Sequence, residues 1–320
     1  MFSRRSILAL LPTTIAAGAV AAGALAAPAT AQPARTLRIG FQKGEPTLVA
    51  AKQNRSLETA LAPLGVNVEW LEFPFGPPML EAMRVGSIDF GGVGDTPPIF
   101  AQAAHADLLY VAGLPAGASA LLVPSGSKLQ ALHDLKGKKL AFARGSSAHN
   151  LAVVAVEKAG LAWSDIVPVP LAPADAAAAF ERGSIDAWSI WDPYYAMYET
   201  RPGVRVLAST ADLVAQNSFY IAGHAFVTAN PAIIAKTIDT MAGVATWSRA
   251  HRTELAALLA AGTGVPEAIE LRAIERSPLK VLPMDDALAD SQQQEADRFH
   301  ALGLIPTAIN VRTQIWHVSA

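Results

Sequence analysis

Residues 85–98 read VGSIDFGGVGDTPP and residues 182–195 read RGSIDAWSIWDPYY, so the chain uses nearly the same phrase twice. In each copy a glycine follows a stretch with helical spacing, as expected where a helix ends. Ser-Ile-Asp then opens a short apolar stretch. Each stretch runs into an aspartate closely followed by proline, which is typical of the start of the next helix. The repetition predicts two related halves that face one another.

The rest of the chain alternates short apolar strands with alanine-rich helices. The pattern predicts strands at residues 37–41, 67–73, 88–93, 108–112, 120–123, 139–143 and 185–190. It predicts helices at 47–64, 79–85, 97–104, 129–132, 148–159 and 174–182, and from residue 231 onward at 232–251, 253–261, 266–275 and 285–302. Strands that alternate with helices indicate βαβ units and mostly parallel sheets covered on both faces. We therefore expect an α/β protein with two lobes.

Composition narrows the class of protein. Apolar residues make up 52% of the chain and charged residues 16%, which indicates a large core. The formal net charge is −2 and the sequence has no basic block, which argues against a nucleic-acid partner. The sequence has no cysteine, which excludes disulfides, thiolate metal ligands and a lipid-anchored N-terminal cysteine.

The first 31 residues have the composition of a secretory signal. Arg4 and Arg5 precede a run rich in Ala, Leu and Gly that ends in small residues at 29–31, and SRRSIL resembles a twin-arginine signal. A membrane anchor is the alternative, and Pro12 together with the low hydrophobicity of alanine favours the signal. We expect residues 1–31 to be removed and the mature protein to be exported to the periplasm.

Three predicted turns from strand to helix could bind an anion. Ligands of open α/β sheets lie beyond the carboxyl ends of strands, where helix N-termini offer free N–H groups. The candidates are Gly94, Asp95 and Thr96 in the first turn, Ser146, Ser147 and His149 in the second, and Trp191, Asp192 and Tyr194 in the third. The two aspartates are also expected as helix caps, and the two serines could serve as caps alone. Gln42, which follows the first strand, adds an amide donor.

The sequence gives little support for catalysis or metal binding. No G-x-S-x-G elbow surrounds the serines, and His149 lies within one helical turn of them, too near for an ordinary catalytic triad. The seven histidines have no HxH, HxxH or HExxH spacing. Among the aromatic residues at 188–198, Trp188 is expected in the core, whereas Trp191 and Tyr194 could form the wall of a pocket for an organic group. We predict a binding protein that uses no metal or cofactor.

Several long strings resemble the aliphatic-sulfonate-binding proteins of bacterial ABC importers. The strings are residues 40–51 (GFQKGEPTLVAA), 72–111, 142–152 (FARGSSAHNLA), 183–196 and 291–316. The resemblance implies a type II periplasmic binding fold, in which two α/β lobes joined by a hinge close over a ligand. Together with the order of the predicted strands and helices, the resemblance places lobe 1 at residues 32–120 and 225–320 and lobe 2 at 121–224. The chain would cross between the lobes near 119–123 and 222–225.

The resemblance also implies a function. The protein would capture aliphatic (alkane) sulfonates and deliver them, as a monomer, to a membrane permease for sulfur acquisition. The cleft would be lined by Gln42, Gly94, Asp95, Thr96, Ser146, Ser147, His149, Trp191 and Asp192. The wider superfamily leaves taurine, nitrate or a sulfate ester as alternative ligands. An enzyme resembling thiamine-pyrimidine synthases is a further alternative, which the export signal and the lack of cysteine disfavour because those enzymes are cytosolic and carry cysteine.

Glu45 departs from the family's pattern. It follows Gln42-Lys43-Gly44, where the family often has an uncharged residue. A carboxylate near a bound sulfonate lowers affinity unless a cation faces it. Glu45 could therefore meet an amine on a zwitterionic sulfonate, or it could form an ion pair with Lys43 in solvent, which we favour.

Overall fold

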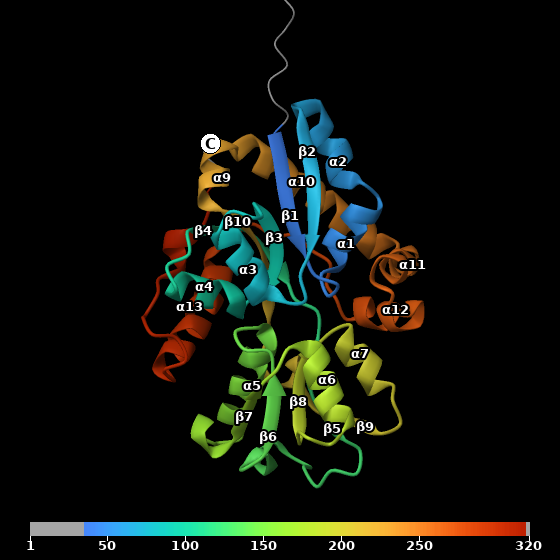
Figure 1. Cartoon of the computed structure of the whole chain (residues 1–320), viewed down its shortest axis with the longest axis vertical. Helices are drawn as coiled ribbons and strands as arrows, with labels where there is room; N and C mark the ends of the chain where they lie inside the picture. Colours follow the sequence, from blue (N-terminus) through green and yellow to red (C-terminus); the bar gives the residue numbers. More distant parts are fainter. Residues whose placement is uncertain (1–34, 318–320) are drawn as a thin grey trace, which may run out of the picture. The chain divides into compact units, whose positions relative to one another are not determined.

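The computed structural model describes residues 35–317, and the expected signal at 1–31 lies outside them. These residues form two five-stranded sheets, which define lobe 1 and lobe 2 (Figure 1). The strand order in lobe 1 is β2 (Val66–Glu72), β1 (Arg35–Phe41), β3 (Phe90–Gly94), β10 (Asn217–Gly223) and β4 (Leu108–Pro115). The order in lobe 2 is β7 (Val167–Pro170), β6 (Lys139–Phe142), β8 (Ala187–Trp191), β5 (Ser119–Pro124) and β9 (Val204–Ser209).

The two sheets share one topology. The first three strands of each order run parallel, and the fourth strand is antiparallel to both of its neighbours. In lobe 2 the fourth strand, β5, follows directly after β4 of lobe 1, and in lobe 1 the fourth strand, β10, follows after the last elements of lobe 2. In each sheet, the antiparallel strand is therefore the first strand that the chain forms after it crosses from the other lobe. The expected α/β fold of two lobes is confirmed.

The strand pairing differs from the lobe boundaries we expected at 120/121 and 224/225. Ser119 and Ala120 already pair with β8 of lobe 2, and β10 pairs with β3 and β4 of lobe 1. The chain therefore passes between the sheets at residues 116–118 and 214–216 rather than near 119–123 and 222–225. The sequence pattern did not predict β10. This strand begins with polar residues and is followed at once by a helix, so it lacks the apolar pattern of a central strand.

Helices cover the sheets. Lobe 1 carries α1 (Pro46–Gln53), α2 (Ser56–Leu61), α3 (Gly76–Arg84), α4 (Thr96–Ala103), α9 (His224–Ala229), α10 (Pro231–Ala250), α11 (Arg252–Thr263), α12 (Glu267–Glu275) and α13 (Asp286–Ala301). Lobe 2 carries α5 (Ser147–Lys158), α6 (Pro173–Glu181), α7 (Tyr194–Glu199) and α8 (Thr210–Leu213). Within residues 35–317 no helix combines the length and apolar character needed to cross a membrane.

Short 3₁₀ turns and one broken helix refine the predicted elements. The 3₁₀ turns are η1 (Ala62–Leu64), η2 (Leu132–Leu135), η3 (Trp163–Asp165) and η4 (Val311–Gln314). The single helix predicted at 47–64 is wrong, because the segment consists of α1, α2 and η1. Arg55, with a φ of 52°, is in the left-handed conformation and ends the α-helical path.

The repeated phrase has the same role in both lobes. Gly86 and Gly183 have φ angles of 72° and 67°, the left-handed conformation that ends a helix. Asp89 then donates its N–H to the Arg38 carbonyl and accepts the Arg38 N–H with its carboxylate. Asp186 makes the same two bonds with Lys139. Each Gly-Ser-Ile-Asp phrase therefore ends a helix and aligns the next strand with its parallel neighbour.

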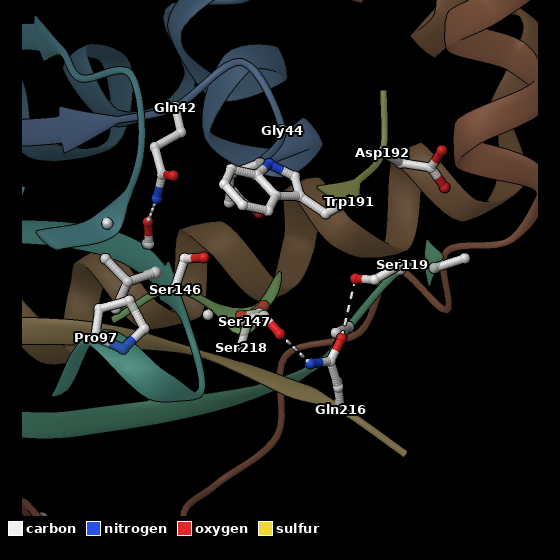
Figure 2. Close-up of a pocket in the computed structure, with 18 residues that line it drawn as sticks. Gln42, Gly44, Pro97, Ser119, Ser146, Ser147, Trp191, Asp192, Gln216 and Ser218 are labelled. Atoms are coloured by element: carbon white, nitrogen blue, oxygen red, sulfur yellow. Dashed lines mark hydrogen bonds between the residues drawn. The ribbon is translucent and has the colours of Figure 1, made fainter. Parts of the chain in front are cut away.

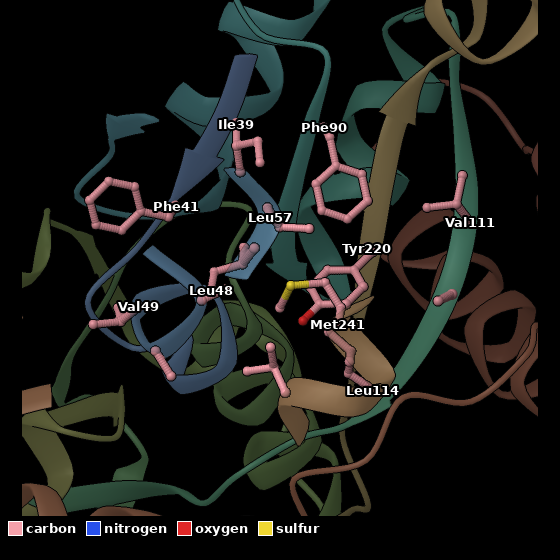
Figure 3. Packing of buried hydrophobic residues seen from close by; sticks show 14 of the residues in the cluster. Ile39, Phe41, Leu48, Val49, Leu57, Phe90, Val111, Leu114, Tyr220 and Met241 are labelled. Atoms are coloured by element: carbon pink, nitrogen blue, oxygen red, sulfur yellow. The ribbon is translucent and has the colours of Figure 1, made fainter. Parts of the chain in front are cut away.

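The core of lobe 1 lies on both faces of its sheet. Along β10, Tyr220 packs with α1 and α10, whereas Phe219 and Ile221 pack with α3 and α13 on the opposite face. Successive side chains of a strand point to opposite faces, so a single strand serves both clusters. Figure 3 shows the first cluster, in which Tyr220 and Phe90 lie with their ring centroids 5.1 Å apart. This packing fixes the strand ends from which the site is built.

Candidate ligand-binding site

A cavity with a volume of about 100 Å³ lies between the lobes, where strands β1, β3 and β8 end (Figure 2). Its residues come from both lobes and from both crossing segments. They are Gln42, Gly44, Glu45, Gly76, Gly92, Val93, Gly94, Pro97, Ala116, Gly117, Ala118, Ser119, Ser146, Ser147, Trp191, Asp192, Gln216 and Ser218. The structure thus brings together six of the ten predicted site residues: Gln42, Gly94, Ser146, Ser147, Trp191 and Asp192.

The N-terminus of α5 has free hydrogen-bond donors at the cavity, which Ser146 and Ser147 line. Within residues 35–317 the N–H groups of Ser147 and Ala148 and the Ser147 hydroxyl have no hydrogen-bond partner. The Ser146 hydroxyl instead donates to the Ala143 carbonyl at 2.6 Å. Two free N–H groups, a free hydroxyl and the dipole of a 12-residue helix form a favourable environment for an oxyanion. The prediction that this turn faces a cleft therefore agrees with the geometry, with Ser147 as the available hydroxyl.

The first predicted turn is not a donor site of this kind. Thr96 donates its N–H to Asp95 at 2.9 Å, and Pro97 and Pro98 have no N–H. Asp95 and Thr96 are 3% and 0% exposed and do not line the cavity. Only Gly94 and Pro97 of this turn reach it.

Asp95 and Thr96 belong instead to a buried polar network between the lobes. Glu295 of α13 accepts the Thr96 hydroxyl at 2.6 Å, and the Asn150 amide of α5 donates to Glu295 at 2.8 Å and to Asp95 at 3.1 Å. Burial, together with the neighbouring Asp95 carboxylate, raises the pKa of Glu295 well above its usual range. The sequence could not reveal this network, because Glu295 lies 199 positions after Thr96, the residue that it binds.

His149 and Tyr194 also lie away from the cavity. The His149 ring stacks on Phe142 with centroids 4.4 Å apart and meets the edge of Phe299 at 5.1 Å. Burial lowers the pKa of His149 to about 3, so the ring is neutral. Its Nδ1 accepts the Gly145 N–H rather than a serine hydroxyl, so it activates neither serine. Tyr194 packs against Trp188 in the core of lobe 2.

Trp191 and Asp192 bring lobe 2 against Gly44 of lobe 1. A Cβ on Gly44 would lie 2.9 Å from the Asp192 carbonyl and 3.1 Å from the Trp191 indole nitrogen, so the glycine permits this approach. The Asp192 carboxylate accepts the Ala196 N–H of the first turn of α7 at 3.0 Å, although the N-cap position itself is occupied by Pro193 rather than by Asp192 as predicted. It also pairs with Arg276 at 2.8 Å, yet burial outweighs the arginine and raises the pKa of Asp192 to about 6.

The sequence interpretation missed the residues contributed by the crossings. Gln216 donates to the Ser147 carbonyl at 2.7 Å and accepts the Ser119 hydroxyl at 3.0 Å (Figure 2). Ser218 lies beside it at the start of β10. These polar residues have no motif of their own, and recognising β10 as a strand is the signal that would have located them.

Glu45 also lines the cavity, and the ion pair with Lys43 that we favoured is wrong. Lys43 Nζ donates to the Thr263 carbonyl at 2.7 Å. The Glu45 carboxylate caps α1 by accepting the Leu48 N–H at 2.5 Å, and it accepts the Thr47 hydroxyl at 2.6 Å. Burial raises the pKa of Glu45, although these hydrogen bonds oppose the shift.

The cavity is lined mainly by neutral polar and apolar groups. Among the residues of 35–317 that line it, none is Lys, Arg or His, and its ionisable side chains are Glu45 and Asp192. The same part of the chain contains no cluster of three or more His, Cys, Asp or Glu side chains that could hold a metal ion. The other polar side chains of the lining are those of two glutamines and four serines.

Known proteins with this architecture match over nearly the whole chain. The family model for the periplasmic phosphonate-binding protein of ABC transporters matches residues 56–261. A putative aliphatic sulfonates-binding protein of Escherichia coli is 44% identical over 283 residues, which cover 88% of each chain. The solved alkanesulfonate-binding protein SsuA of Xanthomonas axonopodis pv. citri, bound to MOPS, is 41% identical with a TM-score of 0.84, covering 89% of this chain and 99% of that one.

A second solved relative gives the same result. The periplasmic aliphatic sulphonate binding protein SsuA of Escherichia coli is 42% identical with a TM-score of 0.81, covering 90% of this chain and 94% of that one. These relatives are binding proteins rather than enzymes, which agrees with the prediction from the sequence. The chain therefore belongs to the aliphatic sulfonates-binding family of periplasmic substrate-binding proteins of ABC transporters.

Proposed function

We propose that this protein is the periplasmic component of an ABC importer that captures aliphatic sulfonates. The N-terminus of α5 carries the proposal, because its two free N–H groups and the Ser147 hydroxyl can donate to the oxygens of one sulfonate. Trp191, which lines the same cavity from the end of β8, would cover the carbon chain of the ligand. Gln42, Ser146 and Asp192 complete the proposed lining.

The lack of Lys, Arg and His among the lining residues of the described chain favours a sulfonate over a phosphonate, the ligand named in the family model. A sulfonate carries one negative charge and is a weak base, so neutral donors can bind and release it. A phosphonate close to neutral pH carries more charge, which is best neutralised by Arg or Lys. The lining residues of the described chain include neither, which supports the sulfonate.

Binding would close the lobes about the crossings at 116–118 and 214–216. Gln216 of the second crossing forms hydrogen bonds with the Ser147 carbonyl and the Ser119 hydroxyl. A movement of α5 would therefore act directly on this crossing. A ligand held by both lobes favours the closed form, which a membrane permease would then recognise. No bond of the ligand is broken. We further propose export by residues 1–31, by the twin-arginine route, and action as a monomer in sulfur acquisition.

Titration calorimetry on residues 32–320 in a sulfonate-free buffer tests the proposal. The ligands are propane-1-sulfonate, octane-1-sulfonate, taurine, methylphosphonate, sulfate and nitrate. We expect micromolar or tighter binding that is confined to organic sulfonates, and the order of chain lengths measures the pocket. Binding of methylphosphonate or nitrate alone would keep the transport role and refute the ligand, and binding of none would refute both.

A further inference from the structure

Of the two acidic side chains that line the cavity, Asp192 and Glu45, only Asp192 has a cationic partner. Asp192 forms an ion pair with Arg276 at 2.8 Å. Glu45 forms no ion pair with any Lys, Arg or His of residues 35–317, although it lines the same cavity. The cavity therefore holds one carboxyl group that no Lys, Arg or His side chain of the described residues neutralises.

Glu45 has a fixed position. Its two oxygens accept the Leu48 N–H and the Thr47 hydroxyl, and the Thr47 oxygen lies 2.6 Å from the Tyr220 hydroxyl, which is buried in the core of lobe 1. A carboxylate has about four acceptor sites, so the hydrogen bonds from Leu48 and Thr47 leave at least one free. The side chain is thus held in place with capacity for a further donor.

Nearby basic side chains do not use this capacity. Lys43 bonds the Thr263 carbonyl, and Lys280 lines a neighbouring hollow with Glu45 without forming an ion pair with it. The donors at the N-terminus of α5 belong to lobe 2, whereas Glu45 belongs to lobe 1. A ligand enclosed between the lobes would therefore meet oxyanion donors from lobe 2 and, from lobe 1, a carboxyl group without a cationic partner.

We propose that Glu45 determines specificity by selecting sulfonates that carry an ammonium or other cationic group remote from the sulfonate. This inference rests on the proposed function. A plain alkanesulfonate brings a second negative charge into the cavity beside Glu45, which weakens its binding. A zwitterionic sulfonate brings its own counter-charge, and its N–H groups can use the free acceptor sites of Glu45.

The proposal predicts opposite pH dependences for the two ligand classes. Burial raises the pKa of Glu45, so the group takes up a proton more readily than an exposed glutamate. A cationic ligand favours the ionised form and should bind better as the pH rises, whereas a plain alkanesulfonate should bind better as the pH falls. The other ionisable groups near Glu45 are Tyr220, which bonds Thr47, Asp192 in the same cavity and Lys280 in the neighbouring hollow, while Lys43 lies next to it in the sequence and bonds Thr263.

Taurine and propane-1-sulfonate form a matched pair of probes, because an ammonium in one replaces a methyl group in the other. We expect the wild-type protein to prefer taurine. In Glu45→Gln the amide oxygen can still cap α1, and the ratio of taurine affinity to propane-1-sulfonate affinity should fall by about tenfold. The pH dependence of this ratio should also flatten. Glu270→Gln is the control, because Glu270 is a buried acid outside the lining, and it should leave the ratio unchanged.

The outcomes separate this inference from the proposed function. An unchanged ratio in Glu45→Gln, or an equal loss for both ligands, would assign Glu45 to the cap alone and overturn the inference while sulfonate binding stands. Failure of the wild-type protein to bind either probe would overturn the proposed function itself. If Glu45→Gln fails to fold, the wild-type pH profile decides, since a ratio that does not rise with pH overturns the inference.

Discussion

Gly94 and Ser147 meet across the cavity with no room for a side chain between them. A Cβ on Gly94, at the end of β3, would lie 1.8 Å from Ser147 Oγ and 3.2 Å from Ser147 Cβ. The serine hydroxyl can rotate away, whereas its Cβ moves only with α5 and the rest of lobe 2. The pair therefore sets how closely the lobes approach.

We expect Gly94→Ala to hold the lobes apart and to weaken sulfonate binding by at least about tenfold. Calorimetry measures the affinity, and small-angle scattering with ligand measures closure. Gly243→Ala is the matched control, because a Cβ on this exposed helical glycine meets nothing within 4 Å. Closure and affinity equal to wild type in Gly94→Ala would show that the contact does not limit the lobes.

The two neighbouring serines should differ in their contribution to binding. The Ser147 hydroxyl has no partner in the described chain, whereas the Ser146 hydroxyl donates to the Ala143 carbonyl. Ser147→Ala should weaken alkanesulfonate binding by about tenfold, because it removes a hydrogen bond to a charged group. Ser146→Ala should chiefly lower the free energy of unfolding. If calorimetry ranks the two variants in the reverse order, the Ser146 hydroxyl turns toward the ligand on binding.

Arg276 joins the lobes at the edge of the cavity. From the end of α12 it pairs with Asp192 at 2.8 Å and with Glu199 at 2.7 Å, and it lies over the Tyr195 ring at 4.0 Å. Arg276→Gln leaves the largely buried Asp192 carboxylate without a cationic partner, whereas Glu199 keeps Arg272, and it should lower the free energy of unfolding by about 2 kcal/mol. Arg276→Lys should restore only part of this loss, because an ammonium cannot bridge both carboxylates in the same geometry.

Urea unfolding of both variants and of the double variant with Asp192→Asn measures the coupling. The energies of Arg276→Gln and Asp192→Asn should not add, because the two residues share one ion pair. Additive energies would mean that the pair contributes nothing to stability.

In the network of Asp95, Asn150 and Glu295, replacing the Glu295 carboxyl group by an amide should destabilise the fold less than removing the Asn150 amide donor. Glu295→Gln is a neutral substitute for a carboxyl group whose pKa is raised well above its usual range, so it should cost less than about 1 kcal/mol. Asn150→Leu leaves two buried carboxyl oxygens without their donor and should cost about 2 kcal/mol. A larger loss in Glu295→Gln than in Asn150→Leu, measured by urea unfolding, would show that Glu295 is ionised.

Stability should fall as the pH rises from about 4 to 7. Burial raises the pKa of Asp192 from 3.8 to about 6 and that of Glu270 from 4.5 to about 7. The folded state therefore binds more protons than the unfolded state in this window, and the free energy of unfolding decreases with rising pH. Exposed acids with lowered pKa values, such as Glu81, act in the opposite direction only at more acidic pH.

Urea unfolding at pH 5 and pH 7.5 checks the sign. The difference between the two values should shrink in Glu270→Gln, which removes one of the titrating groups. An undiminished difference would mean that Glu270 does not titrate in this window.

The sequence predicted those parts of the fold that depend on neighbouring residues. Gly86 and Gly183 end helices because the local backbone needs the left-handed conformation, and the aspartates that follow bond the adjacent strand in both lobes. Ser147 could be placed at a helix start by the same local reasoning. Strand β10 could not, because its place between β3 and β4 depends on a return of the chain from lobe 2.

The sequence did not show which candidate residues line the cavity when their contacts come from residues distant in the sequence. Asp95 and His149 have residue types suited to a binding site, but Glu295 and Phe299 of α13 turn one into a member of a buried network and the other into part of an aromatic core. The resemblance to the family located the cleft without distinguishing side chains that face it from those that support it. Glu45 shows the reverse case, in which an unusual residue does line the cavity.

The late position of β10 in the chain has a consequence for folding during synthesis. All five strands of the lobe 2 sheet lie between residues 119 and 209, whereas the lobe 1 sheet lacks a central strand until residues 217–223 are made. On a ribosome, the half of the molecule that begins first is therefore completed last. The N-terminal strands must wait, unpaired at their centre, for a segment that emerges more than 100 residues after β4.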